Sequence, residues 1–171
     1  MDKNFKYCPR CRTRIIQINR GKELSCEKCG FYYYRNAAPT VAAILVNSKR
    51  EILLVKRKFP PYKNYWDLPG GFVDDNENLE KALVREVREE LNIILDSYGY
   101  IGSATDSYPY KGIIYKTIVA VYTSTIEDKI TLGDDVVDYC FFPKNNFPNP
   151  QFAFPGLAKV VEKYINQNIS P

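Results

Sequence analysis

The chain of 171 residues is 45% hydrophobic and 14% aromatic, enough to bury the core of one medium-sized domain with a small appendage. Its 24 basic and 20 acidic residues give a formal charge of +4, and the complete lack of histidine excludes Ser-His-Asp and Cys-His catalysis and any histidine-ligated metal. No apolar run approaches the roughly 18 residues of a membrane helix, and the polar N-terminus lacks a signal peptide's apolar stretch. We therefore expect a cytoplasmic protein with no membrane partner.

Four of the five cysteines lie in the first thirty residues as two CxxC pairs, Cys8 with Cys11 and Cys26 with Cys29, separated by fourteen residues. This spacing predicts a small four-thiolate zinc ribbon. Metal binding would supply much of its folding energy, because so short a segment buries little apolar surface. Disulfides are the less favoured alternative in a chain without a secretory signal, and iron in place of zinc stays open.

Charge divides unevenly between the expected ribbon, residues 1–37, and the expected second domain, residues 38–171. The ribbon holds nine basic and three acidic residues, a formal +6 that four thiolates and one Zn²⁺ would bring to +4, whereas the remainder carries −2. A basic ribbon suits nucleic acid or a polyphosphate as a partner. We favour a structural ribbon that packs on the second domain or mediates a homodimer, with Phe31–Tyr34 as the junction strand.

The second domain is expected to open with two paired strands, at Thr40–Val46 and Ile52–Val55. The second strand runs into a basic triplet that includes Arg57, and the triplet faces a segment rich in proline and tyrosine, residues 59–68. This loop suits one wall of a substrate pocket in which Arg57 and Tyr65 are candidate contacts, the cation meeting phosphate oxygens. A solvated basic strand end is the alternative.

The next stretch, residues 70–93, reads GGFVDDNENLEKALVREVREELNI and organises the rest of the chain. Its last part is helix-like, and on a helix Glu86, Glu89 and Glu90 fall within an arc of roughly 100°. Like charges at these spacings repel, so a cation should compensate them, and hard oxygen ligands favour Mg²⁺ or Mn²⁺. A solvated acidic face on an amphipathic helix is the alternative.

The spacing within this stretch carries a resemblance. From Gly71, five residues lead to Glu77, seven more lead to Arg85, and the sequence EVREE follows. This pattern resembles the signature box of the Nudix hydrolase family, which cleaves nucleoside diphosphates linked to another group. Asn92 stands where that family usually has glycine, and asparagine tolerates the left-handed helix end. The resemblance covers about residues 39–165 and implies an α/β fold, an α/β/α sandwich around a mixed sheet.

The resemblance also implies the roles of the box acids. Glu86 and Glu90 would be metal ligands for Mg²⁺ or Mn²⁺, and Glu89 would be a further ligand or the general base. The Gly70 carbonyl would complete the coordination. Such a metal makes water nucleophilic and offsets phosphoryl charge, and without histidine the base must be a carboxylate or a metal hydroxide.

Two further features of the family have counterparts here. Glu77 and Arg85 would pair and brace the glycine loop against the helix. A carboxylate from a late loop often joins the site, and here Asp135 is the first candidate and Asp134 the second, both following Gly133.

The remaining chain is predicted to be mostly β-structure. We expect strands at Tyr98–Ala104, Ile113–Thr125 and Val136–Phe142, a turn at Thr105–Gly112 and a helix at Gly156–Asn168. The box helix should begin at an N-cap of Asp75 or Asn76. The fifth cysteine, Cys140, lies among aromatic residues and is expected to be a buried strand thiol.

Substrate preference is indicated only in part. A zinc ribbon before a Nudix domain is the arrangement of the NADH pyrophosphatase group, but the downstream array SQPWPFPxS of that group is absent from this sequence. Family hallmarks lie about sixteen residues past the box: proline for ADP-ribose hydrolases and tyrosine for dinucleoside polyphosphate hydrolases. Pro109 lies sixteen residues past Ile93, between Tyr108 and Tyr110, which are candidate substrate contacts.

The sequence therefore predicts a metal-dependent pyrophosphatase acting on ADP-ribose or a similar ADP-linked compound, with NADH or dinucleoside polyphosphates as alternative substrates. An alternative of another kind is a nucleotide-sensing or RNA-associated binding module that uses the pocket and the basic ribbon. The three box acids favour the enzyme, because a sensor has no use for three repelling carboxylates.

Overall fold

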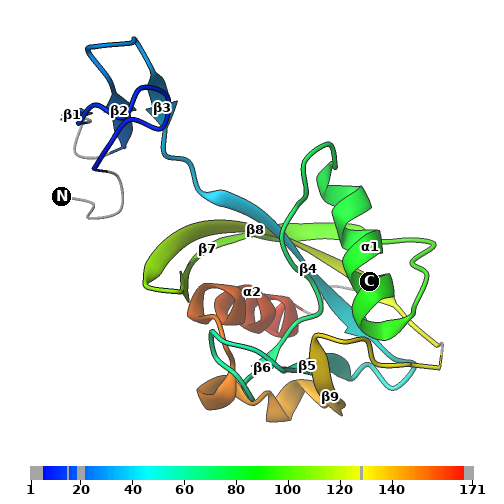
Figure 1. Ribbon diagram of the computed structural model, residues 1–171. Helices are drawn as coiled ribbons and strands as arrows, with labels where there is room; N and C mark the ends of the chain where they lie inside the picture. Colours follow the sequence, from blue (N-terminus) through cyan, green and yellow to red (C-terminus); the bar gives the residue numbers. More distant parts are fainter. Residues whose placement is uncertain (1–5, 15, 19–21, 128, 168–171) are drawn as a thin grey trace. The chain divides into compact units, whose positions relative to one another are not determined.

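The computed structural model describes residues 6–14, 16–18, 22–127 and 129–167. It divides into two compact units, Met1–Ala37 and Ala38–Pro171 (Figure 1). The elements in chain order are β1 (Ile16–Ile18), β2 (Glu23–Ser25), β3 (Tyr32–Tyr34), β4 (Ala38–Val46), β5 (Ile52–Arg57), β6 (Trp66–Asp67), α1 (Leu79–Leu91), β7 (Gly99–Tyr110), β8 (Ile113–Thr125), β9 (Val136–Phe142), the short 3₁₀ helices η2 (Lys144–Asn146) and η3 (Asn149–Gln151), and α2 (Pro155–Asn166).

The first unit is a three-stranded antiparallel sheet in the order β1-β2-β3. Each CxxC pair lies in a tight turn. The Cys8 N–H donates to the Thr13 carbonyl and closes the first turn, and the Cys26 N–H donates to the Phe31 carbonyl and closes the second. The buried core consists of Cys8, Leu24 and Cys26 among the described residues. So small a core cannot offset the entropy of ordering the segment by itself.

The second unit is built on a mixed sheet in the order β6-β5-β4-β8-β7, with β9 paired to β5. Strands β4 and β8 are parallel, and the other pairs are antiparallel. Helices α1 and α2 cover opposite faces, so the expected α/β class with a mixed sheet is confirmed. Among the described residues, neither helix is long and apolar enough to cross a membrane.

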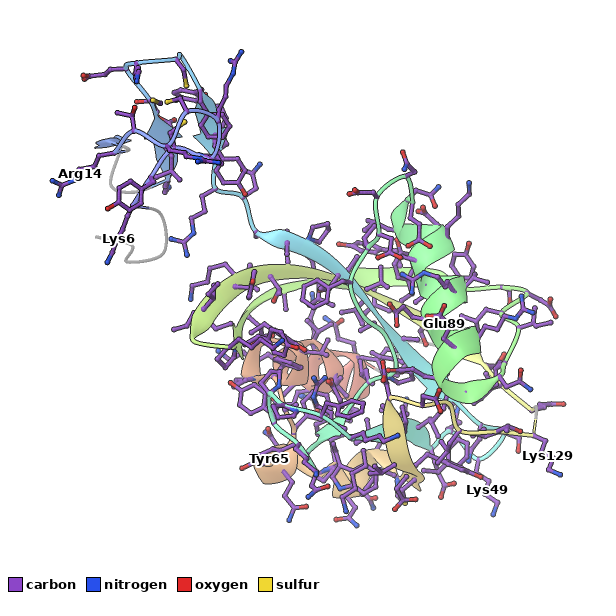
Figure 2. The ribbon with its side chains drawn as sticks, viewed as in Figure 1. Lys6, Arg14, Lys49, Tyr65, Glu89 and Lys129 are labelled. Atoms are coloured by element: carbon purple, nitrogen blue, oxygen red, sulfur yellow. The ribbon has the colours of Figure 1, made fainter. Side chains whose placement is uncertain are left out.

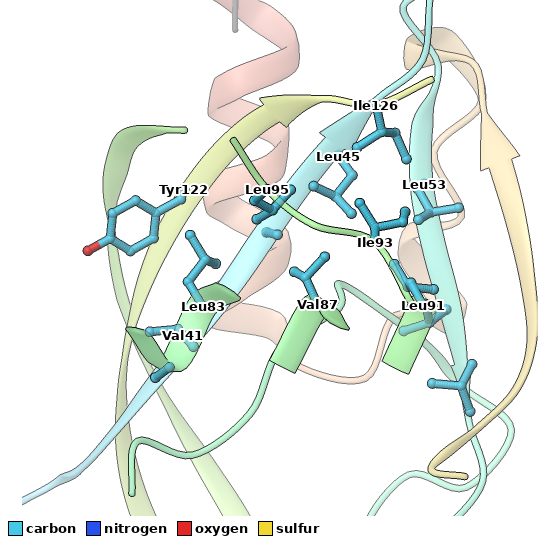
Figure 3. Packing of buried hydrophobic residues seen from close by; sticks show 14 of the residues in the cluster. Val41, Leu45, Leu53, Leu83, Val87, Leu91, Ile93, Leu95, Tyr122 and Ile126 are labelled. Atoms are coloured by element: carbon cyan, nitrogen blue, oxygen red, sulfur yellow. The ribbon is translucent and has the colours of Figure 1, made fainter. Parts of the chain in front are cut away.

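Alternation along β4 divides the core into two layers. Val41, Ala43 and Leu45 face α1, whereas their neighbours Ala42, Ile44 and Val46 face α2. Against the first layer, α1 packs the apolar stripe formed by Leu83, Val87 and Leu91 (Figure 3). All three of these side chains are fully buried, so the rotation of α1 about its axis is set by the core.

The ends of α1 follow from its capping residues. The helix begins at the N-cap Asn78, whose side chain accepts a hydrogen bond from the Lys81 N–H, so the predicted N-cap at Asp75 or Asn76 is wrong. Asn76 instead has a positive φ of 69° in the preceding turn. The helix ends at Asn92 in the left-handed conformation with a φ of 56°, as predicted for this substitute for glycine.

Two other predictions fail in the β-rich part. The turn predicted at residues 105–112 is mostly strand, because β7 pairs with β8 as far as Tyr110↔Ile113 and only Lys111 and Gly112 turn. Cys140 is exposed rather than buried, since β9 pairs with β5 alone and lies at the edge of the sheet. The prediction of burial, which was based on the apolar neighbours of Cys140, is therefore wrong.

Candidate active site

Helix α1 presents two of its three predicted site acids to a cleft in the second unit; the third, Glu89, is 60% exposed and does not line that cleft. Because Leu83, Val87 and Leu91 face the core, Glu86 and Glu90 lie along the edge of that buried stripe and line the cleft. The loop after the glycine turn contributes a third acid, a late loop contributes a fourth, and strand β6 contributes a fifth. The acidic residues around the cleft are Asp67, Asp74, Glu86, Glu90 and Asp135.

Glu90 connects α1 to the glycine turn. Its Oε2 atom accepts a hydrogen bond from the Gly70 N–H at 3.1 Å. Burial raises the pKa of the Glu90 carboxyl well above its ordinary value, and the nearby Glu86 raises it further, against the opposing effect of the Gly70 N–H. A desolvated carboxylate beside a second carboxylate is the environment that a divalent cation stabilises.

The two glycines of the turn allow this close approach. A Cβ at Gly70, which has a φ of +146°, would collide with the Val41 carbonyl of β4. A Cβ at Gly71 would lie 2.5 Å from Oε1 of Glu86. The turn is bonded to β4 on its other side, where the Val41 N–H donates to the Gly71 carbonyl at 2.9 Å. A side chain at Gly70 would therefore push the turn away from β4, whereas one at Gly71 would displace the flexible Glu86 carboxylate.

Arg85 binds the acidic segments together. Its Nε and Nη2 donate to the two oxygens of Glu77 at 2.8 and 2.9 Å, and Nη1 donates to Glu86 at 2.8 Å and to Glu89 at 3.0 Å. A further bond from Nη2 reaches the Phe72 carbonyl at 3.0 Å. These charge-assisted bonds fix the loop against α1, and hydrogen bonding to Arg85 lowers the pKa of Glu77.

The late loop is fastened to the C-terminal end of α1. The Gly133 N–H donates to the Glu90 carbonyl at 2.8 Å, and the Lys58 Nζ donates to the Asp134 carbonyl at 2.7 Å. Asp135 lines the same cleft as Glu86 and Glu90. The fold thus brings a residue 45 positions further along the chain beside the helix acids.

An aromatic pocket adjoins the acidic cleft. Its rings belong to Phe72, Tyr108 and Phe154. Phe72 meets Tyr108 edge to face with centroids 5.2 Å apart, and Tyr108 and Phe154 are nearly parallel with centroids 6.1 Å apart. The Arg57 guanidinium carbon lies 5.2 Å from the centre of the Phe154 ring and 5.9 Å from that of Tyr108. Aromatic rings can stack on a nucleotide base, and the Arg57 guanidinium can bind its phosphate, so the pocket suits a base joined to phosphate.

Phe154 reaches the pocket because of how α2 begins. The two oxygens of Asp106 on β7 accept hydrogen bonds from the Gly156 and Leu157 N–H groups, both at 2.9 Å. These are backbone groups of the first turn of α2, which lack partners within the helix. Asp106 therefore fixes the helix end that carries Phe154.

The candidate substrate contacts fall into two groups. Arg57, Tyr108 and Asp135 line the cleft or the pocket. Tyr65 is 43% exposed on the loop before β6, and Tyr110 is 41% exposed near the end of β7, and neither lines the two cavities. Figure 2 shows Glu89 on α1 and Tyr65 on its separate loop. The tyrosine content of these two segments did not indicate which tyrosine side chains point into the cavities.

Sequence reasoning missed several lining residues, among them Asp67, Phe72, Asp74 and Phe154. Phe72 directly follows the glycine turn, and Asp67 and Asp74 each lie three residues from it, so their proximity to the box was an available signal. Phe154 had no such signal, because it enters the pocket from α2, more than 60 residues past the box.

In the first unit, the four ribbon cysteines form a cluster in which all Sγ atoms lie within 4.8 Å of one another. All four are free thiols, with 3.6 Å between the Sγ atoms of Cys8 and Cys29 and 3.4 Å between those of Cys11 and Cys26. Tetrahedral bonds of about 2.3 Å to zinc place sulfur atoms roughly 3.8 Å apart, so the donor set fits the ion. Hydrogen bonds from Thr13 lower the pKa of the Cys11 thiol, whereas burial and the other three cysteines raise the pKa of the Cys29 thiol, so the fit to zinc rests on the positions of the sulfur atoms.

A mixed sheet between two helices, with a glycine turn bonded to an acidic helix, is the fold of Nudix proteins. The structure is similar to a NUDIX hydrolase from Nitrosomonas europaea with a TM-score of 0.68, 24% identity, and coverage of 95% of this chain and 91% of that one. Residues 36–164 match the NUDIX domain family. The chain therefore belongs to the NUDIX family, as the box spacing predicted.

Three relatives are similar in sequence. An ADP-ribose pyrophosphatase from Methanocaldococcus jannaschii is 34% identical over 124 residues, which cover 71% of this chain and 72% of that protein. The NAD-capped RNA hydrolase NudC from Haemophilus influenzae (strain PittEE) is 31% identical over 167 residues, which cover 96% of this chain. That match spans 60% of the length of the Haemophilus influenzae protein. NudC from Pseudomonas aeruginosa (strain LESB58) is 28% identical over 105 residues, which cover 61% of this chain and 37% of that protein.

Proposed function

We propose that this chain is a metal-dependent hydrolase of a nucleoside diphosphate linked to another group, with ADP-ribose or a similar ADP-linked compound as substrate. The observation that carries the proposal is the continuity of the two cavities, which share Arg57, Asp67 and Tyr108 together with the glycine turn. An acidic cleft for metal-bound phosphate thus adjoins an aromatic pocket for a base. A diphosphate-linked nucleotide has both chemistries in one molecule.

The relatives support this substrate class. One is named an ADP-ribose pyrophosphatase, and its similarity covers most of both chains. The Haemophilus influenzae NudC supports a second candidate, an NAD-linked substrate, because its similarity extends over the ribbon as well. Both candidates contain an adenosine diphosphate unit, so the same pocket and cleft would serve either.

The chemistry requires water to attack one phosphorus of the diphosphate and the bridging P–O bond to break. Mg²⁺ or Mn²⁺, when bound, supplies a nucleophilic water and neutralises phosphoryl charge. In this proposal Glu86, Glu90 and the Gly70 carbonyl hold the ion. Glu89 or Asp135 accepts the proton of the attacking water; Glu89 is paired with Arg85, whereas Asp135 lines the cleft.

The first unit is proposed to be a structural zinc ribbon, residues 1–37, followed by the catalytic domain, residues 38–171. Support comes from the tetrahedral fit of the four cysteines and from the small apolar core of that unit. A homodimer is retained as a proposal that size measurement in solution would test. Nucleic acid as a partner of the basic ribbon is less favoured.

The test is turnover of a substrate panel with Mg²⁺ and with Mn²⁺, comparing the wild-type protein with Glu90→Gln. The panel contains ADP-ribose, NADH, NAD, ADP-glucose, diadenosine polyphosphates, CoA and nucleoside triphosphates. We expect ADP-ribose to be hydrolysed to AMP and ribose 5-phosphate and Glu90→Gln to be inactive. Lack of turnover of every compound, together with tight nucleotide binding that Glu90→Gln leaves unchanged, would replace the hydrolase with a sensor.

A further inference from the structure

Arg57 is held unusually firmly at the junction of the two cavities. It ends β5, where its Nη1 donates to Oδ2 of Asp67 at 2.8 Å and its Nε donates to the Pro61 carbonyl at 2.9 Å. The rings of Phe154 and Tyr108 lie 5.2 and 5.9 Å from its guanidinium carbon. Two donor edges and a face of the guanidinium are therefore occupied, which fixes its orientation.

The Nη2 edge of the same guanidinium has no hydrogen-bond partner within the part of the chain that the structure describes. Because the guanidinium is planar, fixing Nε and Nη1 also fixes the direction in which the Nη2 donors point. The Arg57 side chain is 20% exposed and lines both cavities. Its free donors are thus available to an anionic group bound between the cleft and the pocket.

Asp67 is the group that holds Nη1. It lies on the two-residue strand β6, where the register Val55↔Asp67 places it beside β5, and it is only 5% exposed. Its Oδ1 accepts a hydrogen bond from the Leu68 N–H at 2.9 Å, so each carboxylate oxygen has one partner.

Stability alone gives a poor account of this buried pair. Burial raises the pKa of Asp67 to about 6 in spite of the adjacent Arg57, so the ionised carboxylate is disfavoured by its surroundings. Buried ion pairs are often no more stable than apolar packing of the same volume. Orientation of the Arg57 donors is a role that apolar packing could not fill.

We propose that Asp67 is a positioning residue, which orients Arg57 so that its Nη2 donors bind the diphosphate between the acidic cleft and the aromatic pocket. The inference rests on the proposed function, since it requires a diphosphate-linked nucleotide in the cleft. Arginine suits the role because its planar donors match phosphate oxygens, whereas a lysine would offer a freely rotating point charge. Asp67 acts through Arg57.

The test is steady-state kinetics with ADP-ribose and Mg²⁺ on Asp67→Asn, Arg57→Ala and the double variant, with exposed Asp96→Asn as the matched control. An asparagine has one oxygen and cannot accept from both Leu68 and Arg57 through its two terminal atoms. We expect Asp67→Asn to raise KM about tenfold with kcat changed by less than about threefold, as for loss of uniform binding. In the Arg57→Ala background, Asp67→Asn should raise KM no further.

An unchanged KM in Asp67→Asn, or an equal rise of KM with Arg57 absent, overturns the positioning role and leaves the hydrolase intact. A wild-type protein that hydrolyses none of the panel overturns both. Circular dichroism of each variant distinguishes a folding defect from a change in substrate binding. Because Asp67→Asn leaves the Arg57 charge without its carboxylate partner, the variant should melt somewhat below the wild-type temperature at pH 7.5 with kcat retained. A lower melting temperature with a matching loss of kcat would indicate a purely structural residue and overturn the inference.

Discussion

The carboxylate of Glu90 accepts a hydrogen bond from the backbone N–H of Gly70, 20 residues earlier in the chain, at 3.1 Å. This bond joins the two ends of the box, the glycine turn and the acidic helix. It also places a desolvated carboxylate where the proposed ion would lie, so under the proposed function one residue would serve both the packing of the turn and the binding of metal. The two roles have separable consequences.

Glu90→Gln should separate these roles. The glutamine oxygen can still accept from Gly70, and because the folded-state pKa of Glu90 is raised, the wild-type protein loses stability as pH rises through that pKa while the variant does not. We expect the metal-free variant to melt at or above the wild-type temperature at pH 7.5. The rise in melting temperature caused by Mn²⁺ should disappear.

Differential scanning fluorimetry with and without Mn²⁺ makes this measurement, and Glu80→Gln on the exposed first turn of α1 is the control. A variant that retains the Mn²⁺-induced rise would remove Glu90 from the proposed ligand set.

The two glycines of the turn should fail in different ways when replaced by alanine. Gly70→Ala forces a side chain against the Val41 carbonyl at a φ of +146°, a backbone strain of roughly 1–3 kcal/mol, which lowers the melting temperature by about 3–10 °C. Gly71→Ala displaces only the Glu86 carboxylate, so it should leave most of the stability and weaken Mn²⁺ binding about tenfold or more.

Thermal melts and Mn²⁺ titration by calorimetry check the pair. Gly99→Ala is the matched control, because a Cβ there meets nothing within 4 Å. Equal loss of stability in the Gly70 and Gly71 variants would contradict the distinct contacts found here.

The ribbon should hold one metal ion per chain, bound through all four of its cysteines. We expect inductively coupled plasma mass spectrometry to find about one zinc per wild-type chain and almost none in Cys11→Ser, because three thiolates leave the tetrahedral site open. Cys140→Ser removes an exposed cysteine outside the cluster and should retain the zinc. Iron in stoichiometric amount would correct the identity of the metal, and loss of zinc from Cys140→Ser would contradict the assignment of ligands.

Asp67 should make stability depend on pH in a defined direction. Its pKa is about 6 in the folded protein and about 3.9 in an unfolded chain, so its contribution is complete below about pH 4 and is lost as pH rises through 6. The free energy of unfolding of the wild-type protein, relative to Asp67→Asn, should therefore fall by about 3 kcal/mol at most between pH 4 and pH 7.

Urea unfolding in the presence of a chelator measures this difference, and subtraction of the variant removes the titration of the other carboxylates. A difference that stays flat or grows as pH rises would show that Arg57 fully compensates the burial of Asp67.

The sequence by itself determined the features that depend on local spacing. The CxxC pairs are closed by short turns, and the turn spacing alone brings each pair of sulfurs together. Likewise helical periodicity puts Glu86 and Glu90 together on the cleft, whereas Glu89, at the margin of the predicted arc, is exposed and does not line it. The long strands β8 and β9 were predicted at their observed bounds, since alternation and β-branched residues mark them.

Only the tertiary structure decided which distant residues meet the box. Asp135 arrives by the docking of a late loop on α1, and Phe154 arrives because Asp106 caps α2. Both depend on contacts between segments far apart in the chain; Asp135 was expected only through the family resemblance, and nothing in the sequence indicated Phe154. The exposure of Cys140 has the same origin, because the pairing of whole strands decides which of them lies at an edge, and local apolar content does not.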